Sequence, residues 1–223
     1  MVKTLIFDMG GVLVTLDHGE AVRRFREIGL REAASLLDTY TQVGPFGALE
    51  EGKITVDEFM AEMSRLAGRT LTYDECAYGW LGYTKDAPQR NYDLLTRLRQ
   101  KGYRLILLSN MNPFVNAWLE NAYTLPDPFN RETPEGLWRP SFPPNRPLSS
   151  YFDGCYRSYE MHLMKPDDRV MQLILEREAI DPATTLLIDD GPRNVEMGRR
   201  FGLQTLQPIN GTDWTADVER LCL

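Results

Sequence analysis

The sequence contains little cysteine or histidine and no long apolar run. Three cysteines and two histidines occur among 223 residues, and the cysteines are isolated, without CxxC spacing. This pattern is typical of free thiols in a reducing compartment and excludes a disulfide framework and a cysteine–histidine zinc site. No stretch reaches the roughly 18 uninterrupted apolar residues of a membrane span. Asp8 interrupts the apolar start and no small-residue cleavage site follows, so we expect no signal peptide and a cytoplasmic protein.

Basic residues are also scarce relative to acidic ones. The chain has 25 Lys and Arg against 32 Asp and Glu, a formal net charge of −7. This balance argues against nucleic acid as a partner, although local donors and a metal can still bind a small phosphate ester. Hydrophobic residues make up 43% and charged residues 26%, which is typical of a globular protein. The length suits one large α/β domain or a core with a small accessory domain.

Short apolar runs that end in polar residues predict buried strands. The four clear runs and a weaker fifth are KTLIFD (3–8), YRLILLSN (103–110), FDGCYRS (152–158), TTLLIDD (184–190) and GLQTLQP (202–208). Helical patterns over 87–102 and 167–180 separate the later runs. Continuous apolar runs are typical of a parallel sheet covered on both faces. We therefore predict a Rossmann-like, three-layer α/β fold.

Residues 17–87 break the alternation of strands and helices. They carry helical periodicity without a strand signal, and Thr55 and Glu58 have the spacing of a capping box. A helical insert directly after the first strand would lie over the carboxyl ends of the strands, where α/β sheets bind ligands. We therefore predict a core formed by 1–16 and 88–223, with 17–87 inserted as an all-helical cap domain.

A second interruption, residues 125–147, contains seven prolines and has neither a helical nor a strand period. A loop of this length in a compact domain is either functional or disordered. Its aromatic residues Phe129, Trp138 and Phe142 argue against full disorder.

Polar side chains that can carry chemistry follow the predicted strands. In chain order they are Asp8, Ser109, Asn110, Lys165, Asp189 and Asp190. Because parallel strands end at one edge of a sheet, we expect these side chains to converge. Three carboxylates would repel one another there unless a cation joined them, and all-oxygen ligands suit Mg²⁺. A metal, a lysine and a serine form a site for a phosphoryl group, which Asp8 could attack.

These motifs resemble those of the haloacid dehalogenase superfamily of aspartate-nucleophile phosphatases. FDMGGVL, LLSN, MKP and LIDDGPRN match its four motifs in order. The insert with EEGKITVDEFMAEM is similar to the helical C1 cap of subfamily I, in the branch of bacterial glucose-1-phosphate phosphatases and the N-terminal phosphatase domain of soluble epoxide hydrolases. The resemblance implies a Mg²⁺-dependent phosphatase that hydrolyses a small phosphorylated metabolite, such as a sugar phosphate, through an aspartyl-phosphate intermediate.

The resemblance also implies the metal ligands. It makes Asp8 both the catalytic nucleophile and a ligand of Mg²⁺, and it makes the backbone carbonyl of Gly10 a second ligand. Asp190 is implied as a direct carboxylate ligand. Asp189 is implied as a ligand that acts through a metal-bound water.

The phosphoryl group is implied to bind to a different set of residues. Ser109, Asn110 and the catalytic Lys165 correspond to the residues that hold its oxygens in the family. Asn194 corresponds to a residue that steadies the last loop. Charge spread over phosphoryl oxygens needs such positioned donors.

The sequence departs from the family at Gly10. The usual pattern has a second aspartate there, which protonates the leaving oxygen and later activates water. Loss of a general acid/base lowers the rate by about 10²–10⁴-fold. Phosphomutase chemistry is therefore disfavoured, and Asp17, His18 or a water are candidates to replace the missing acid.

Two alternatives differ in kind from a phosphatase. Dehalogenases of the same superfamily use the aspartate without a metal, but the paired Asp189 and Asp190 argue against that reaction. A catalytically degenerate member would bind a phosphorylated ligand or a protein without turnover. Gly10 supports this second alternative, and residues 125–147 would then be its interaction surface.

Overall fold

The computed structural model describes residues 2–38, 42–127, 129 and 146–222. In this part of the chain, the centre is a parallel sheet of five strands in the order β5-β4-β1-β6-β7. The strands are β1 (Thr4–Phe7), β4 (Arg104–Ser109), β5 (Gly154–Arg157), β6 (Thr185–Ile188) and β7 (Gln204–Leu206). Each strand lies within one of the predicted runs, so the predicted Rossmann-like α/β fold is confirmed.

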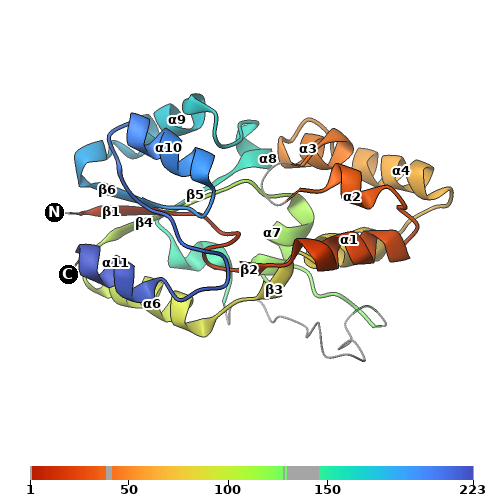
Figure 1. Cartoon of the computed structure of the whole chain (residues 1–223), viewed down its shortest axis with the longest axis horizontal. Coiled ribbons are helices and arrows are strands. Elements are labelled where there is room, and N and C mark those ends of the chain that lie inside the picture. The colour runs from red at the N-terminus through yellow and green to blue at the C-terminus, as the bar shows by residue number, and fades with distance from the viewer. Residues whose placement is uncertain (1, 39–41, 128, 130–145, 223) are drawn as a thin grey trace.

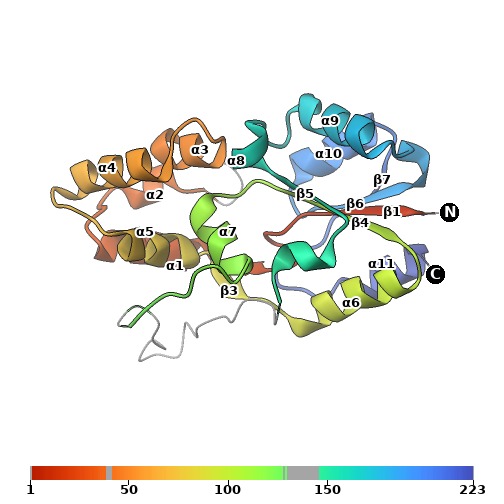
Figure 2. The same ribbon diagram turned by 180° about the vertical axis from the view of Figure 1, so that it is seen from behind.

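Helices cover both faces of the sheet (Figures 1 and 2). They are α6 (Gln89–Gln100) and α11 (Thr215–Cys222) on one face, and α9 (Asp168–Glu178) and α10 (Pro192–Arg200) on the other. Side chains of β1 alternate between two buried clusters: Leu5 and Phe7 pack under α6 and α11, and Ile6 packs under α9 and α10. Burial on both faces explains why the strand is apolar at successive positions.

A helical insert lies beyond the carboxyl ends of the strands (Figure 1). The chain enters and leaves it through a short antiparallel pair, β2 (Thr15–Leu16) and β3 (Thr84–Asp86). Its helices are α1 (His18–Glu27), α2 (Ala33–Leu36), α3 (Gly44–Glu50), α4 (Val56–Ala67) and α5 (Tyr73–Leu81). The predicted capping box begins α4, where Thr55 Oγ1 accepts a bond from Glu58 N and Glu58 Oε2 accepts one from Thr55 N.

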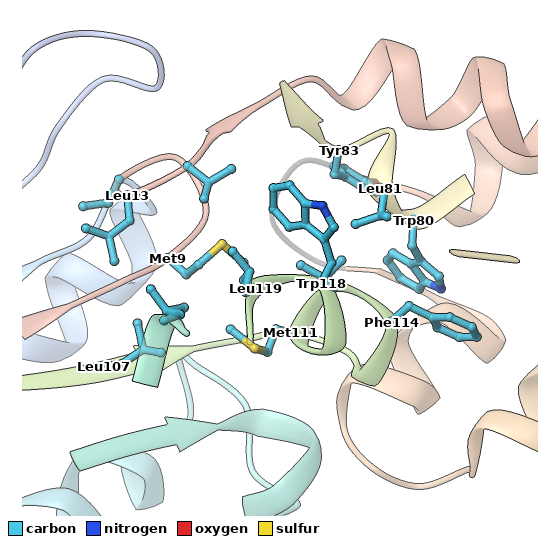
Figure 3. Close-up of a cluster of buried hydrophobic side chains, with 14 of the residues drawn as sticks. Met9, Leu13, Trp80, Leu81, Tyr83, Leu107, Met111, Phe114, Trp118 and Leu119 are labelled. Carbon is cyan, nitrogen blue, oxygen red and sulfur yellow. The ribbon is translucent and has the colours of Figure 1, made fainter. Parts of the chain in front are cut away.

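Aromatic side chains join the insert to the sheet. Phe46 packs edge-to-face on Phe59 with ring centroids 5.3 Å apart, and Phe59 lies 5.8 Å from Phe114 of α7 (Pro113–Leu119), the helix after β4. Figure 3 shows Phe114 beside Trp80 of the insert. All four side chains belong to the cluster that continues under the sheet. These tilted and edge-to-face pairs are favourable and fix the insert over the strand ends.

The proline-rich segment 125–147 lies largely outside the described residues, as do Trp138 and Phe142. Phe129 is described and packs on Tyr78 of α5, with ring centroids 5.2 Å apart. The remaining short elements are α8 (Ser158–Met161) and the 3₁₀ turns η1 (Leu148–Tyr151) and η2 (Pro182–Thr184).

Cys76, Cys155 and Cys222 are free, as their isolated positions predict. Burial raises the pKa of each thiol to about 11 or 12, so the thiolate is a minor form at neutral pH. Across the described residues, no helix combines the length and apolar character needed to cross a membrane.

Side chains from two distant helical regions hold the turn that follows β1. Asn91 of α6 donates from Nδ2 to the carbonyls of Val12 (3.0 Å) and Leu13 (3.2 Å). Trp214 donates from Nε1 to the Val12 carbonyl at 3.0 Å. Asn91 and Trp214 are both buried. Without these donors, the buried carbonyls of Val12 and Leu13 would lose hydrogen bonds that water could not replace. The conformation of the turn therefore depends on Asn91 and Trp214.

Replacing Asn91 tests this support. We expect Asn91→Ala to lower the free energy of unfolding by about 1–3 kcal/mol, because it leaves buried carbonyls short of a donor. Urea denaturation measures the change. Gln89→Ala, at an exposed position of the same helix, is the control and should change it by less than about 0.5 kcal/mol. Equal losses in the two variants would contradict the account.

Candidate active site

The polar residues singled out in the sequence meet at the carboxyl edge of the sheet. Asp8 directly follows β1, Ser109 ends β4 and Asp189 follows β6. Because β1 lies between β4 and β6, Asp8 occupies the middle of this group. Lys165 comes from the loop between α8 and α9 and reaches the same place. The predicted convergence at one sheet edge is therefore present.

A buried lysine joins two of the carboxylates. Lys165 Nζ lies 3.0 Å from Asp8 Oδ1 and 2.6 Å from Asp189 Oδ2. Carboxylate oxygens of Asp8, Asp189 and Asp190 all lie within 4.8 Å of one another, and all four side chains are buried. One ammonium balances only one of three carboxylates. The cluster therefore carries excess negative charge where water screens it poorly.

The burial of the cluster and its excess negative charge shift the pKa values of Asp8 and Asp190 upward. Burial raises the pKa of Asp8 to about 7, against the opposing effect of the Lys165 ammonium. Burial also raises the pKa of Asp190 to about 6, and the charge of Asp189 adds to that rise. Burial lowers the pKa of Lys165 because it disfavours the charged ammonium. The negative charges of Asp189 and Asp8 have a larger, opposite effect, so the pKa of the lysine lies above its usual value. The cluster favours an added positive charge.

Asp189 has its two carboxylate oxygens engaged within the protein. Its Oδ1 accepts bonds from Gly191 N and from Asn194 Nδ2, both at 2.9 Å, and its Oδ2 accepts the bond from Lys165. The bond from Asn194 links the start of α10 to the loop that carries Asp189. Asp189 thereby fixes the position of the lysine.

Asp190 lies against the turn that follows Asp8. Gly11 has φ +72°, and a Cβ at this position would fall 2.1 Å from Asp190 Oδ2. Only glycine meets both the positive φ and the close approach. The second glycine of the GG pair therefore allows the turn and the last carboxylate to share the site.

Asn110 positions Lys165 through a reciprocal pair of hydrogen bonds. Its Nδ2 donates to the Lys165 carbonyl and its Oδ1 accepts from Lys165 N, both at 2.9 Å. This positioning role was not predicted from the sequence. Ser109 is buried, and its Oγ donates to the Asn110 carbonyl at 3.3 Å.

Asp17 and His18, the candidate replacements for the missing acid, are engaged elsewhere. Asp17 Oδ1 accepts a bond from Glu20 N at 3.0 Å as the N-cap of α1, and His18 Nε2 lies 3.1 Å from the Leu37 carbonyl. Neither residue lines the cavity at Asp8. The assignment of either as the acid is therefore not supported by the structure.

A cavity of about 90 Å³ opens above the carboxylates. Asp8, Gly10, Asn110, Lys165 and Asp190 line its floor. The rest of its lining comes from residues 17–87 and the start of α7, and includes Gln42, Glu50, Trp80, Tyr83, Thr84 and Asn112. Trp80 and Tyr83 stand near the exit of the predicted cap, where the sequence allows either a pocket or a core role, and both line the cavity. Glu50 and Asn112 were not singled out from the sequence.

No signal in the sequence alone points to Glu50 as part of this wall. Glu50 is the last residue of α3, where the helix dipole disfavours a negative charge, and it begins the EEGK stretch. An acidic residue at a helix C-terminus is anomalous, but the anomaly becomes visible only once the helix bounds are known.

Comparisons with known proteins identify the family of this chain. The family model of haloacid dehalogenase-like hydrolases matches residues 2–202. A D-ribitol-5-phosphate phosphatase of Bacteroides thetaiotaomicron is 37% identical over 218 residues, covering 98% of this chain and 97% of the relative.

Two solved structures superpose over nearly all of the chain. One is a predicted HAD-like hydrolase of Porphyromonas gingivalis (35% identity, TM-score 0.85, 100% and 98% of the two chains). The other is a HAD-family enzyme of B. thetaiotaomicron in complex with magnesium and inorganic phosphate (29% identity, TM-score 0.81, 97% and 98% of the two chains). The family model spans most of the sequence and the D-ribitol-5-phosphate phosphatase is similar over nearly its whole length, so the chain belongs to the haloacid dehalogenase-like hydrolase family.

Proposed function

We propose that this chain is a Mg²⁺-dependent phosphatase that hydrolyses a small phosphorylated sugar or polyol through an aspartyl-phosphate on Asp8. The observation that carries the proposal is the buried cluster in which Lys165 Nζ contacts both Asp8 and Asp189, with Asp190 adjoining. The activity of the D-ribitol-5-phosphate phosphatase relative supports the choice of substrate class. The small cavity supports a small substrate.

The carboxylate cluster fits a magnesium ion. The oxygens of Asp8, Asp189 and Asp190 lie close enough to share one ion, and oxygen donors are those that Mg²⁺ prefers. We assign Asp8, Asp190 and the carbonyl of Gly10 as direct ligands. Asp189, whose oxygens already accept bonds from Lys165, Gly191 and Asn194, would act through a water. When bound, the ion would offset the charge of the carboxylates and of the phosphoryl oxygens.

The reaction proceeds by two displacements at phosphorus. An Asp8 carboxylate oxygen attacks the phosphorus, and the bond to the ester oxygen breaks. Water then attacks the aspartyl-phosphate, which releases inorganic phosphate and restores the Asp8 carboxylate. Lys165 and Ser109 donate to the phosphoryl oxygens, and Asn110 keeps the lysine in place.

The helical insert acts as a cap in this proposal. Residues 17–87 form the cap domain, and residues 1–16 and 88–223 form the catalytic core. The insert supplies a wall of the cavity, including Glu50 and Trp80. Such a cover excludes polymers and limits water at the reacting phosphorus.

Replacing Asp8 tests the nucleophile. We expect Asp8→Asn to lower kcat by about 10³-fold or more, because the amide cannot form the covalent intermediate. Phosphate release from D-ribitol 5-phosphate, sugar phosphates and p-nitrophenyl phosphate measures this. Asp17→Asn, which changes a carboxylate that caps α1 away from the cavity, is the matched control and should keep wild-type activity. Binding of a phosphate ester without Asp8-dependent release would favour the degenerate, ligand-binding alternative.

Metal removal tests the cluster. We expect EDTA to abolish phosphate release and Mg²⁺ to restore it. Asp190→Asn should raise the Mg²⁺ concentration for half-maximal activity by about 10–100-fold or more, since a direct ligand is lost. Asp168→Asn removes an exposed carboxylate paired with Arg200 and should leave that concentration unchanged. Release that persists in EDTA would refute the proposed metal.

A further inference from the structure

Glu50 is a buried carboxyl in the wall of the active-site cavity. It ends α3 of the helical insert and is 7% exposed. It lines the same cavity as Asp8, Gly10 and Lys165, which belong to the sheet edge. Glu50 therefore borders the space that a phosphate ester would occupy, and it belongs to the insert that lies beyond the carboxyl ends of the strands.

The surroundings of Glu50 favour its protonated form. Burial raises the pKa of Glu50 to about 8, with a side-chain hydrogen bond from Asn112 acting in the opposite direction. Asn112 Oδ1 accepts a bond from Val115 N at 3.1 Å, so its amide N–H is the group that faces Glu50. Among the described residues, no lysine or arginine forms an ion pair with Glu50. At neutral pH the carboxyl holds a proton that it can give away.

The adjacent residue, Glu51, has the surroundings usual for a glutamate, and Glu50 does not. Glu51 is partly exposed and forms an ion pair with Lys53, as a surface carboxylate commonly does. Glu50 instead combines burial with the C-terminal end of a helix, and both disfavour its ionised form. Buried acids with a raised pKa in a cavity are concentrated at functional sites.

Among the described residues of the core that line the cavity, none offers an acid outside the charge cluster of the nucleophile. Gly10, two residues after the nucleophile, carries no side chain, and a Cβ there would lie 3.1 Å from the side chain of Leu16. Of the ionisable residues that line the cavity, Lys165 and Asp190 belong to the charge cluster of the nucleophile.

Tyr83 is the other ionisable residue in the wall. Burial and then the charge of Glu50 raise the pKa of Tyr83 well above its usual value, so it is a poor proton donor at neutral pH. Its hydroxyl already donates to the Asp38 carbonyl at 3.0 Å. Of the described residues that line the cavity, this leaves Glu50 as the candidate acid.

We propose that Glu50 is the general acid and base of the reaction, supplied by the helical insert in place of the carboxylate that the core lacks. This assignment rests on the proposed phosphatase function. As Asp8 attacks phosphorus and the ester P–O bond breaks, Glu50 gives its proton to the departing oxygen, which leaves as an alcohol. The Glu50 carboxylate then takes a proton from the water that attacks the aspartyl-phosphate. Inorganic phosphate leaves, and Glu50 is protonated again.

A leaving-group test separates this role from a structural one. Glu50→Gln keeps the size of the side chain and its ability to bond Asn112, but has no proton to transfer. We expect kcat/KM for D-ribitol 5-phosphate to fall by about 10²–10⁴-fold, because a departing alkoxide needs a proton. For p-nitrophenyl phosphate we expect kcat/KM to stay close to wild type, because p-nitrophenolate leaves without one. Glu51→Gln is the matched control and should change neither value.

The outcomes are distinct. Equal losses on both substrates in a variant with a wild-type melting temperature, or no loss on either, would overturn the role of Glu50. In those cases Asp8-dependent release by the wild type would still support the phosphatase. Absence of such release in the wild type would refute the proposed function itself. If Glu50→Gln melts early, both kcat/KM values are measured below its melting transition: a loss confined to D-ribitol 5-phosphate supports the role of Glu50, and equal losses on the two substrates overturn it.

Discussion

The buried ammonium of Lys165, held between Asp8 and Asp189, is the interaction on which the rest of the site depends. It brings together carboxylates that would otherwise repel, yet it neutralises only part of their charge. Asn110 holds the backbone of the lysine, and Asp189 holds its ammonium. The remaining negative charge makes the cluster a place for a cation and, with that cation, for a phosphoryl group.

The fold supplies this arrangement at the carboxyl edge of a parallel sheet. Adjacent strands deliver Asp8 and Asp189 from positions 181 residues apart in the sequence. Gly11 permits the turn after Asp8 to approach Asp190, and Asn91 and Trp214 hold that turn from below. The helical insert packs over the edge through buried aromatic rings and so completes the cavity.

The sequence predicted what depends on local pattern. The strands were visible because both faces of the sheet are buried, and Asp8 and Asp189 were visible because each directly follows a strand. Two polar residues of the opposite wall, Glu50 and Asn112, were not predicted. Glu50 and Asn112 come from separate segments, and nothing in their local sequence shows that folding packs them together over Asp8. The expectation that Asp17 could replace the missing acid rested on its closeness to Asp8 in the sequence. In the structure Asp17 instead caps α1.

Thermal unfolding of the wild type and of Asp190→Asn, each with and without Mg²⁺, tests the charge imbalance most directly. We expect Asp190→Asn to melt above the wild type in the absence of Mg²⁺, because one repelling carboxylate is gone. Saturating Mg²⁺ should stabilise the wild type, by about 2.7 kcal/mol at a hundred times its Kd, and should stabilise the variant far less. A wild-type melting temperature that does not respond to Mg²⁺, together with a less stable metal-free variant, would contradict the account.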